Sequence, residues 1–313
     1  MADRKIVLVL GAGASIPYGF PSGRDLVDDI CENYPQNAID MESSSGLQQR
    51  TRARASHFVN RLRHSRRCSI DTFLRDNPDL HEEGKTAIAS VLLKREQKSP
   101  LLYPDDKEDW YRHLFNWLAD DQHPNFANKH LAIITYNYDR SLEHYLFTAL
   151  TNSYQNVDTN AARQLINQVP IVHVHGQLAQ LPWQSSGGGT VSYGGKSRQD
   201  ILEAASGIKV IYEDIHKDPA IKQAHDLLKQ ARVLLFLGFG YDRDNLESLN
   251  LSEVLPTNAS IAGTAFDMTE KELIPVKRQL RRLAPPNKRL NSPGLLNCNN
   301  MEFIRETVHF QRV

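Results

Sequence analysis

Five short apolar segments recur along this chain, and they constrain its fold more than any other feature of the sequence. They are KIVLVL (5–10), LAIITY (131–136), PIVHVH (170–175), VLLFLG (233–238) and ASIAGTA (259–265). Each is mostly apolar on both faces, as expected for parallel strands that helices cover on both sides. Helix-like segments follow several of them, so the sequence predicts a doubly wound, Rossmann-like α/β fold with a mainly parallel sheet.

Two helix starts are readable directly from capping residues. Asp218 followed by Pro219 places a cap before a proline at the first helical position. Thr269 and Glu272 have the spacing of a capping box. Each start follows or precedes a predicted strand, which supports the strand–helix alternation.

Two stretches depart from this alternation. Residues 33–126 show helical periodicity without a convincing strand, and we interpret them as a helical insertion in the α/β domain. Residues 181–200 are rich in glycine and serine, and we expect a mobile loop there.

Composition and charge exclude several classes of protein. The 313 residues include 37 Lys+Arg and 37 Asp+Glu, so no global field favours a nucleic acid or a membrane surface. No apolar run approaches the roughly 20 residues of a membrane span, and the first residues lead directly into a strand-like segment. The three cysteines, Cys31, Cys68 and Cys298, are far apart and form no C-x-x-C pair. We therefore expect a cytoplasmic protein without a cysteine-rich zinc module.

A glycine loop follows the first apolar segment. The residues Gly11, Ala12, Gly13, Ala14 and Ser15 allow backbone N–H groups to approach an anion closely, and a diphosphate is the natural ligand. The usual third glycine is replaced by Ile16, and Pro17 interrupts the following helix, so the loop departs from the dehydrogenase fingerprint. A tight turn without a ligand is the alternative interpretation.

Polar residues also follow the second and third apolar segments. Asn137 and Asp139 leave the second segment, where the alternatives are a ligand site or a turn residue and a helix cap. His173 and His175 alternate in the third, so both are expected on one face, as a metal pair, as one catalytic histidine at the tip, or as core residues. We favour a catalytic His175 with a structural His173.

A second glycine loop, formed by Gly238, Phe239 and Gly240, follows the fourth segment and is expected to line the ribose side of a nucleotide. The carboxyl ends of parallel strands meet at one edge of a sheet. All these residues are therefore expected in one crevice.

Taken in order, these motifs resemble the sirtuin superfamily. Gly11–Ser15, with Phe20 and Pro21 after them, is similar to that family's NAD loop, and TYNYD (135–139) to its Thr-Gln-Asn-Ile-Asp motif. His175-Gly176 is similar to its catalytic His-Gly, and Gly238 onward to its later nucleotide loop. The resemblance implies a single NAD-binding domain over residues 1–313, with Tyr136 in place of the family's glutamine.

A further motif narrows the expected activity. SIDTFL (69–74) resembles the bacterial sirtuin-like NAD hydrolases of antiphage defence, and the zinc cysteines of sirtuin deacylases are not present. The resemblance implies an abortive-infection effector that cleaves NAD to nicotinamide and ADP-ribose, with Asn137 and His175 catalytic, no zinc, and Tyr136 and Asp139 among the NAD contacts. A protein deacylase or ADP-ribosyltransferase, and a module that senses NAD or ADP-ribose without turnover, are the alternatives.

Partners are expected from the same resemblance. It implies a homo-oligomer and a separate sensor protein, either a hexameric ATPase or an Argonaute-like protein, while the neutral charge argues against direct nucleic-acid binding. The segment DWYRHLFNWLAD (109–120) carries Trp110, Leu114 and Trp117 at helical spacing with further apolar residues between them. Either this helix is buried within the chain, or it presents an apolar face for assembly; we expect the latter.

Overall fold

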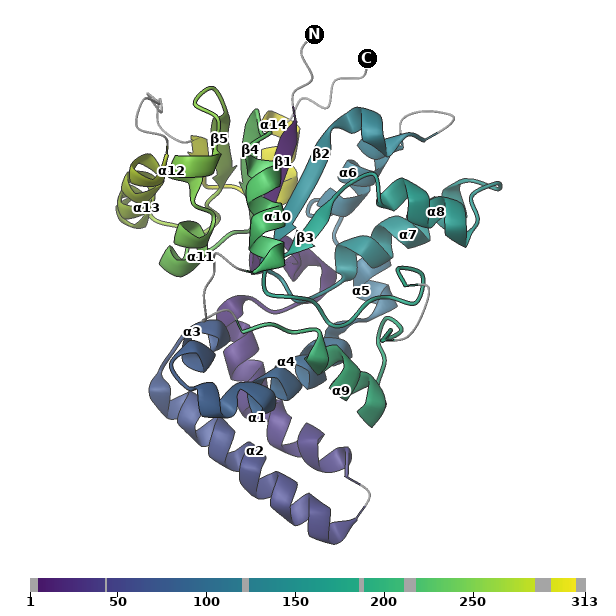
Figure 1. Ribbon diagram of the computed structural model, residues 1–313, viewed down its shortest axis with the longest axis vertical. Helices are drawn as coiled ribbons and strands as arrows, with labels where there is room; N and C mark the ends of the chain where they lie inside the picture. Colours follow the sequence, from purple (N-terminus) through teal and green to yellow (C-terminus); the bar gives the residue numbers. More distant parts are fainter. Residues whose placement is uncertain are drawn as a thin grey trace.

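Six parallel strands form one sheet in the order β3-β2-β1-β4-β5-β6 (Figure 1). The computed structural model describes residues 5–42, 44–119, 124–185, 189–210, 218–284 and 294–307. The strands are β1 (Ile6–Leu10), β2 (Leu131–Thr135), β3 (Ile171–His173), β4 (Val233–Leu237), β5 (Ser260–Thr264) and β6 (Gly294–Leu296). The Rossmann-like α/β fold predicted from the sequence is confirmed, including all five predicted strands.

The strand order reverses beside β1, which is where open α/β sheets bind ligands. β1 pairs with β2 on one side and with β4 on the other. The chain leaves β1 and β4 through the two glycine loops, and these loops touch: the Gly11 N–H donates to the Leu237 carbonyl (3.1 Å) and the Gly13 N–H to the Gly238 carbonyl (2.9 Å). The topology therefore brings both loops to one point.

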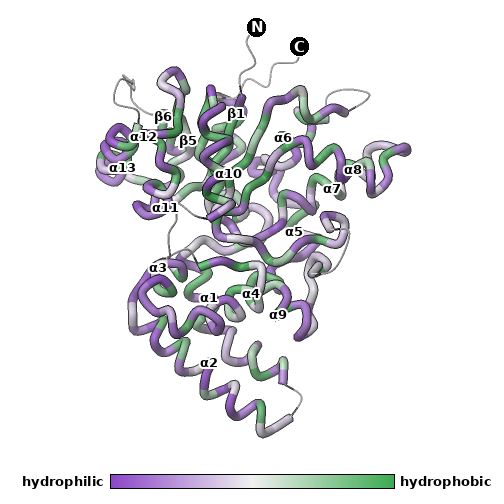
Figure 2. The backbone as a smooth tube through the Cα atoms, in the orientation of Figure 1, coloured by the Kyte–Doolittle hydropathy of each residue, from purple (hydrophilic) through white to green (hydrophobic). Residues whose placement is uncertain are grey.

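Helices cover both faces of the sheet because neighbouring strand residues alternate between two apolar clusters. Val7 and Val9 pack on the side of α10 (Pro219–Leu228), α12 (Leu251–Val254) and α13 (Glu270–Leu283). Leu8 and Leu10 pack on the opposite side, which is covered by α6 (Trp110–Leu118), α7 (Ser141–Ser153), α8 (Thr159–Ile166) and α14 (Asn300–Thr307). The strands are accordingly hydrophobic along their length (Figure 2).

A separate helical layer lies beyond the carboxyl ends of the strands, at the bottom of Figure 1. It contains α1 (Gly23–Asp40), α2 (Ser45–Ser65), α3 (Ile70–Arg75), α4 (His81–Arg95) and α9 (Arg198–Ser206), with α5 (Lys98–Leu102) next to the sheet. The first helix begins at Gly23, ahead of the predicted boundary at residue 33, because Ser22 and Asp25 form a capping box there.

The predicted caps are present at both positions. Asp218 accepts hydrogen bonds from the N–H groups of Ala220 and Ile221 at the start of α10. Thr269 and Glu272 form the capping box of α13. Within the described residues, no helix combines the length and apolar character needed to cross a membrane.

The apolar helix α6 is part of the core, and the expectation that it presents an apolar face for assembly is wrong. Its buried residues are Trp110, Tyr111, Leu114, Phe115 and Leu118. The Trp110 Nε1–H donates to the Ala14 carbonyl (2.8 Å), and the Tyr111 ring stacks on Tyr18 with centroids 3.7 Å apart. The helix is apolar on several sides because it packs between the sheet and the loop that follows β1.

The glycine- and serine-rich segment 181–200 is anchored over part of its length. Residues 186–188 lie outside the described residues. In the described part, the fully buried Arg140–Glu96 pair holds the chain: Arg140 donates to the Val191 carbonyl (2.7 Å) and Glu96 accepts from the Gly194 N–H (2.7 Å). Mobility of the segment stays a prediction.

Candidate functional site

A pocket of about 670 Å³ lies at the carboxyl ends of the strands, against α1 and α3 of the helical layer. Most of the residues predicted for the site line it: Gly11, Ala12, Gly13, Ser15, Phe20, Pro21, Tyr136, Asn137, Asp139, His175, Gly238, Phe239 and Gly240. Ala14 is buried behind this surface. The volume lies in the range of small-molecule and cofactor sites.

The glycines of the two loops are required by close packing of backbone on backbone. Gly238 has φ of +56°, and a methyl group added to it would lie 2.1 Å from the Ala14 nitrogen. A methyl group on Gly11 or Gly13 would lie 2.7–2.8 Å from the backbone of Gly238. These three glycines therefore let the two loops cross in contact.

Most N–H groups of the first glycine loop already donate hydrogen bonds to backbone carbonyls of the protein. Gly11 and Gly13 donate to the β4 loop, the Ala14 N–H donates to Gly11 (2.9 Å), and the Ser15 N–H to Ala12 (3.0 Å). The N–H groups of this loop were predicted to be open to an anion. Among the five residues, only the Ala12 N–H is not used in these bonds, and Ala12 lines the pocket.

The floor of the loop crossing is closed by two further side chains. The Thr264 hydroxyl accepts from the Gly238 N–H (2.8 Å), and the Asn300 amide donates to the Gly13 carbonyl (3.0 Å). Thr264 ends β5 and Asn300 begins α14. Both line the pocket, and neither was predicted from the sequence.

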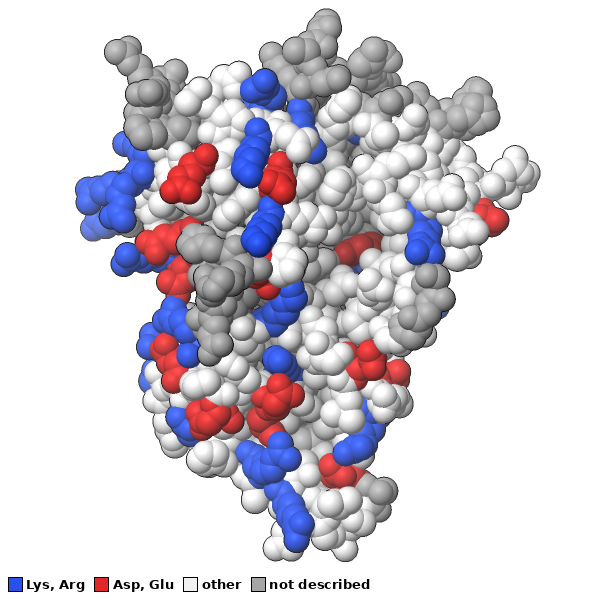
Figure 3. Space-filling view, viewed as in Figure 1, with Lys and Arg blue, Asp and Glu red and all other residues white. Residues whose placement is uncertain are grey.

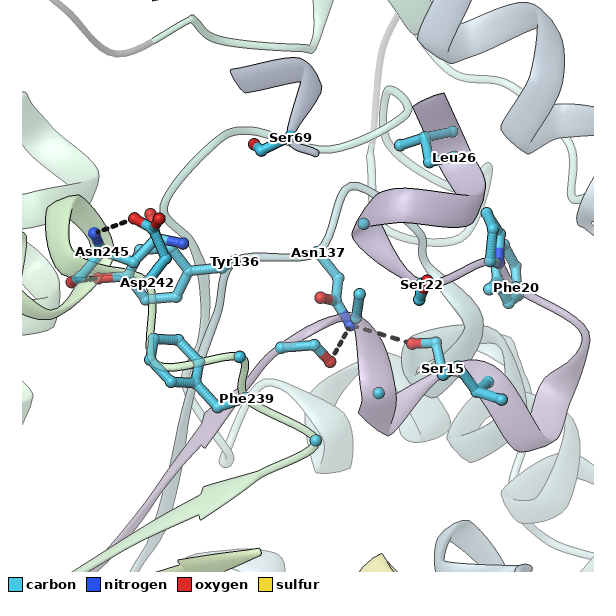
Figure 4. A pocket seen from close by; sticks show the side chains of 18 of the residues that line it. Ser15, Phe20, Ser22, Leu26, Ser69, Tyr136, Asn137, Phe239, Asp242 and Asn245 are labelled. Carbon is cyan, nitrogen blue, oxygen red and sulfur yellow. Dashed lines mark hydrogen bonds between the residues drawn. The ribbon is translucent and has the colours of Figure 1, made fainter. Parts of the chain in front are cut away.

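Asn137 lies in the centre of the pocket wall, as Figure 4 shows. Its side-chain N–H₂ donates to the Gly11 carbonyl (2.9 Å) and to the Ser15 hydroxyl oxygen (3.1 Å). Since these bonds occupy both amide hydrogens, the amide is fixed and its oxygen remains as an acceptor for a ligand.

Aromatic and polar side chains from β2 and β4 form one flank of Asn137 in Figure 4. The Tyr136 ring meets the Phe239 ring edge to face, with centroids 5.4 Å apart. The Tyr136 hydroxyl donates to the Asn245 carbonyl (2.9 Å) and lies 2.6 Å from the Ser248 hydroxyl. Tyr136, which stands where the resemblance implies a glutamine, thus ties β2 to α11 (Arg243–Ser248).

The other flank comes from the start of α1. Ser15, Phe20, Ser22 and Leu26 are on this side of Asn137 (Figure 4). Ser22 is the N-cap of an 18-residue helix and lines the pocket with Gly23. The positive end of the helix dipole therefore faces the pocket, a feature missed in the sequence because Pro17 and Gly19 precede it.

His175 stands next to a carboxylate from the helical layer. Its strand ends at His173, so His175 lies in the following turn before Gly176. His175 Nδ1 is 3.4 Å from Oδ1 of Asp71 on α3, and its ring is edge to face with Tyr136 at 5.2 Å. No role for Asp71 was predicted from the sequence.

His173 is held by different partners. Its Nδ1 is 2.9 Å from the Asn137 carbonyl and its Nε2 is 2.6 Å from a carboxylate oxygen of Glu143 on α7. Burial lowers the pKa of His173, but the charge and hydrogen bond of Glu143 outweigh it and raise the pKa above its usual value. The two histidines thus face different carboxylates, and within the described residues no group of three or more His, Cys, Asp or Glu is placed to hold a metal ion.

Asp139 lies two residues before α7 (Ser141–Ser153), the helix that follows β2. One carboxylate oxygen accepts from the Ser141 N–H (3.0 Å) and from the Ser141 hydroxyl. Burial raises the pKa of Asp139, while hydrogen bonds from Ser141 and Ser15 oppose the shift. Asp139 is therefore connected through Ser15 to Asn137, in addition to lining the pocket.

The comparison with known families finds a match in the middle of the chain. Residues 131–266 match the family described as SIR2-like domain. The chain contains a sirtuin-like domain. No match is found among curated proteins.

The sirtuin-like match runs from β2 to just after β5 and includes Asn137, His175 and the Gly238 loop. A sirtuin-like domain implies binding of NAD and an NAD-related function. The pocket suits such a ligand, because its volume is about 670 Å³ and the N-terminus of α1, which favours an anion, lines it.

Proposed function

We propose that this sirtuin-like protein is an NAD glycohydrolase, which cleaves NAD into nicotinamide and ADP-ribose. The observation that carries the proposal is that a fixed Asn137 amide and the His175 imidazole line one pocket with both glycine loops. Binding alone does not require the histidine. This argues against the sensing alternative. A deacylase or an ADP-ribosyltransferase would use the same pocket, and the three cysteines are too few for the four-cysteine zinc module of the deacylases.

The chemistry follows from the bond that breaks. When the bond between ribose C1′ and the nicotinamide nitrogen breaks, its electron pair neutralises the pyridinium ring, so the leaving group needs no acid. Water then bonds to C1′ and loses a proton. The protein's task is to stabilise an oxocarbenium-like ribose and to place the water.

Each residue has a definable role in this reaction. The oxygen of Asn137 accepts a hydrogen bond from a ribose hydroxyl or from the water, since its N–H₂ group is already engaged. His175 accepts the proton released by the water or polarises a ribose hydroxyl. The start of α1 and the Ala12 N–H lie toward the diphosphate, and Asp139 toward the nicotinamide amide.

The proposal includes a biological setting. The resemblance of SIDTFL to antiphage NAD hydrolases supports an abortive-infection effector that a partner protein or self-assembly activates. A hexameric ATPase or an Argonaute-like sensor is the proposed partner. An unregulated NAD hydrolase would deplete its own cell of NAD. The proposal therefore requires that the protein cleave NAD only when it is activated.

The direct test is release of nicotinamide from NAD by the wild-type protein, with and without companion proteins. His175→Ala and Asn137→Ala are each expected to lower turnover by about 10²–10⁴-fold, the typical loss on removing a positioned catalytic group. His57→Ala and Asn33→Ala, at exposed positions of α2 and α1, are the matched controls. Near wild-type release by a folded His175 or Asn137 variant overturns the assignment, and tight binding without release by the wild type favours the sensing alternative.

A further inference from the structure

The helical layer supplies a carboxylate to the pocket at the imidazole of His175. The His175 side chain is 8% exposed, and its Nδ1 is buried without a hydrogen-bond partner among the described residues. Within the same residues, Asp71 is the only acidic side chain within 4 Å of a His175 ring nitrogen, with its Oδ1 at 3.4 Å from Nδ1. An orphaned ring nitrogen and a carboxylate thus face one another.

Other contacts hold Asp71 in this place. Tyr138 follows Asn137 in the segment after β2. Its hydroxyl donates a hydrogen bond to the same carboxylate oxygen of Asp71, Oδ1. The Ser69 hydroxyl, which caps α3, lies 3.4 Å from Oδ2. At the other end of α3, Arg75 pairs with Asp244 of α11, so the helix has a second contact with the strand-bearing part of the chain besides the one at Asp71.

The ring of His175 is also restrained laterally. Tyr136 meets it edge to face with centroids 5.2 Å apart, and the Tyr138 ring lies at 6.0 Å. Neither contact supplies an acceptor at Nδ1. The orientation of the imidazole about its long axis is therefore set by what Nδ1 bonds to.

We propose that Asp71 is a positioning residue for His175: its carboxylate accepts the Nδ1 proton and leaves Nε2 unprotonated toward the ribose. The inference rests on the proposed hydrolysis and adds a residue from outside the sirtuin-like match. When Nε2 takes a proton from the water or a ribose hydroxyl, the negative carboxylate stabilises the imidazolium, and the Nδ1 proton stays on the ring. Since His175 follows β3 and Asp71 lies on α3, the pair exists only when sheet and helical layer are docked.

The ionisation state of Asp71 agrees with this role. Burial raises the pKa of Asp71, but the neighbouring His175 and the hydrogen bond from Tyr138 outweigh it and lower the pKa. Asp71 is therefore a carboxylate at neutral pH and can only accept a hydrogen bond.

The kinetic test compares Asp71→Asn with Asp76→Asn, a matched change of a more exposed carboxylate that follows α3. Asp71→Asn is expected to lower kcat for NAD cleavage by about 10²-fold or more, as when an orienting carboxylate is lost, with KM changed less than about threefold. The pH–rate profile of Asp71→Asn should also differ from that of the wild type, because the carboxylate that faces the imidazole is lost. Unchanged kcat and an unchanged pH profile would overturn the role of Asp71.

A second measurement needs no turnover. Nitrogen-15 NMR of the His175 ring in the full-length wild-type protein is expected to show the tautomer protonated at Nδ1, with loss of that preference in Asp71→Asn. If Asp71→Asn does not fold, Tyr138→Phe, which removes the hydroxyl that holds Asp71, should weaken the preference. An Nε2-protonated wild-type ring overturns the inference, whereas a wild type with the expected tautomer but no NAD cleavage refutes the hydrolase and leaves the pair intact.

Discussion

At the scale of single residues, His173 and His175 of one motif have different partners and therefore different expected roles. His173 and His175 are separated by one valine, yet one contacts Glu143 on the covered face of the sheet and the other Asp71 at the pocket. The strand ends between them, so the alternation that would align them stops at His173. We therefore expect a catalytic role for His175, which lies in the turn, and a structural role for His173, which lies in the strand.

The substitution His173→Gln tests this division. It removes a buried ion pair and is expected to lower the free energy of unfolding by about 1–3 kcal/mol, while turnover changes only severalfold. The raised pKa of His173 gives the sign of the pH dependence: its stabilisation is complete below about 6.5, the unfolded value, and is lost as the pH rises through the folded value.

Urea unfolding of wild type and His173→Gln at pH 6 and pH 9 measures this difference, which should be larger at pH 6. Glu143, Asp139 and the Asn137 carbonyl are the groups that raise the pKa, so Glu143→Gln should abolish most of the pH dependence. If a folded His173→Gln loses all turnover, or if a stoichiometric metal is found, the metal-pair interpretation returns.

At the scale of elements, the sequence predicted strands better than it predicted where helices pack. Five apolar runs were sufficient for five strands, because a strand covered on both faces must be apolar throughout. β6 was not predicted from the sequence, because it has only three residues and begins with glycine. Asn137 and His175 were predictable because they follow strands, whereas Asp71 arrives on a helix whose position depends on tertiary contacts that no local pattern records.

The helix α6 shows the same limit. An apolar pattern around a helix indicates burial without saying whether the covering surface belongs to the same chain. Here it does: Trp110 is fully buried and its indole N–H is bonded to Ala14 of the glycine loop. This helix thereby supports the loop that crosses Gly238.

Trp110→Ala is the corresponding test. Loss of a fully buried tryptophan is expected to lower the free energy of unfolding by about 3–5 kcal/mol, measured by urea denaturation. Trp117→Ala, a half-buried residue of the same helix under Lys129, should cost clearly less. Equal stability of Trp110→Ala and wild type, with dissociation of an oligomer, would instead assign α6 to an interface.

At the scale of the whole molecule, the distribution of charge can be followed on one face. Lys and Arg are interspersed with Asp and Glu over the face in Figure 3, apart from a group over α13 at its left edge. Helix α13 exposes Lys271, Arg278, Arg281 and Arg282. Because the formal net charge is zero, a charged partner would be attracted by a local group of this kind and not by the molecule as a whole.

The homo-oligomer remains a prediction, and α6 no longer supplies its interface. We still expect assembly with weak basal NAD cleavage that a partner protein stimulates, because an NAD hydrolase must be conditional. Light scattering at micromolar concentration should give a multiple of 35.5 kDa, and NAD cleavage per chain should fall on dilution below the assembly concentration. His175→Ala should assemble like the wild type without cleaving NAD, which separates assembly from chemistry. A monomer of constant activity per chain at every dilution, fully active without a partner, would refute both the assembly and the regulation proposed for it.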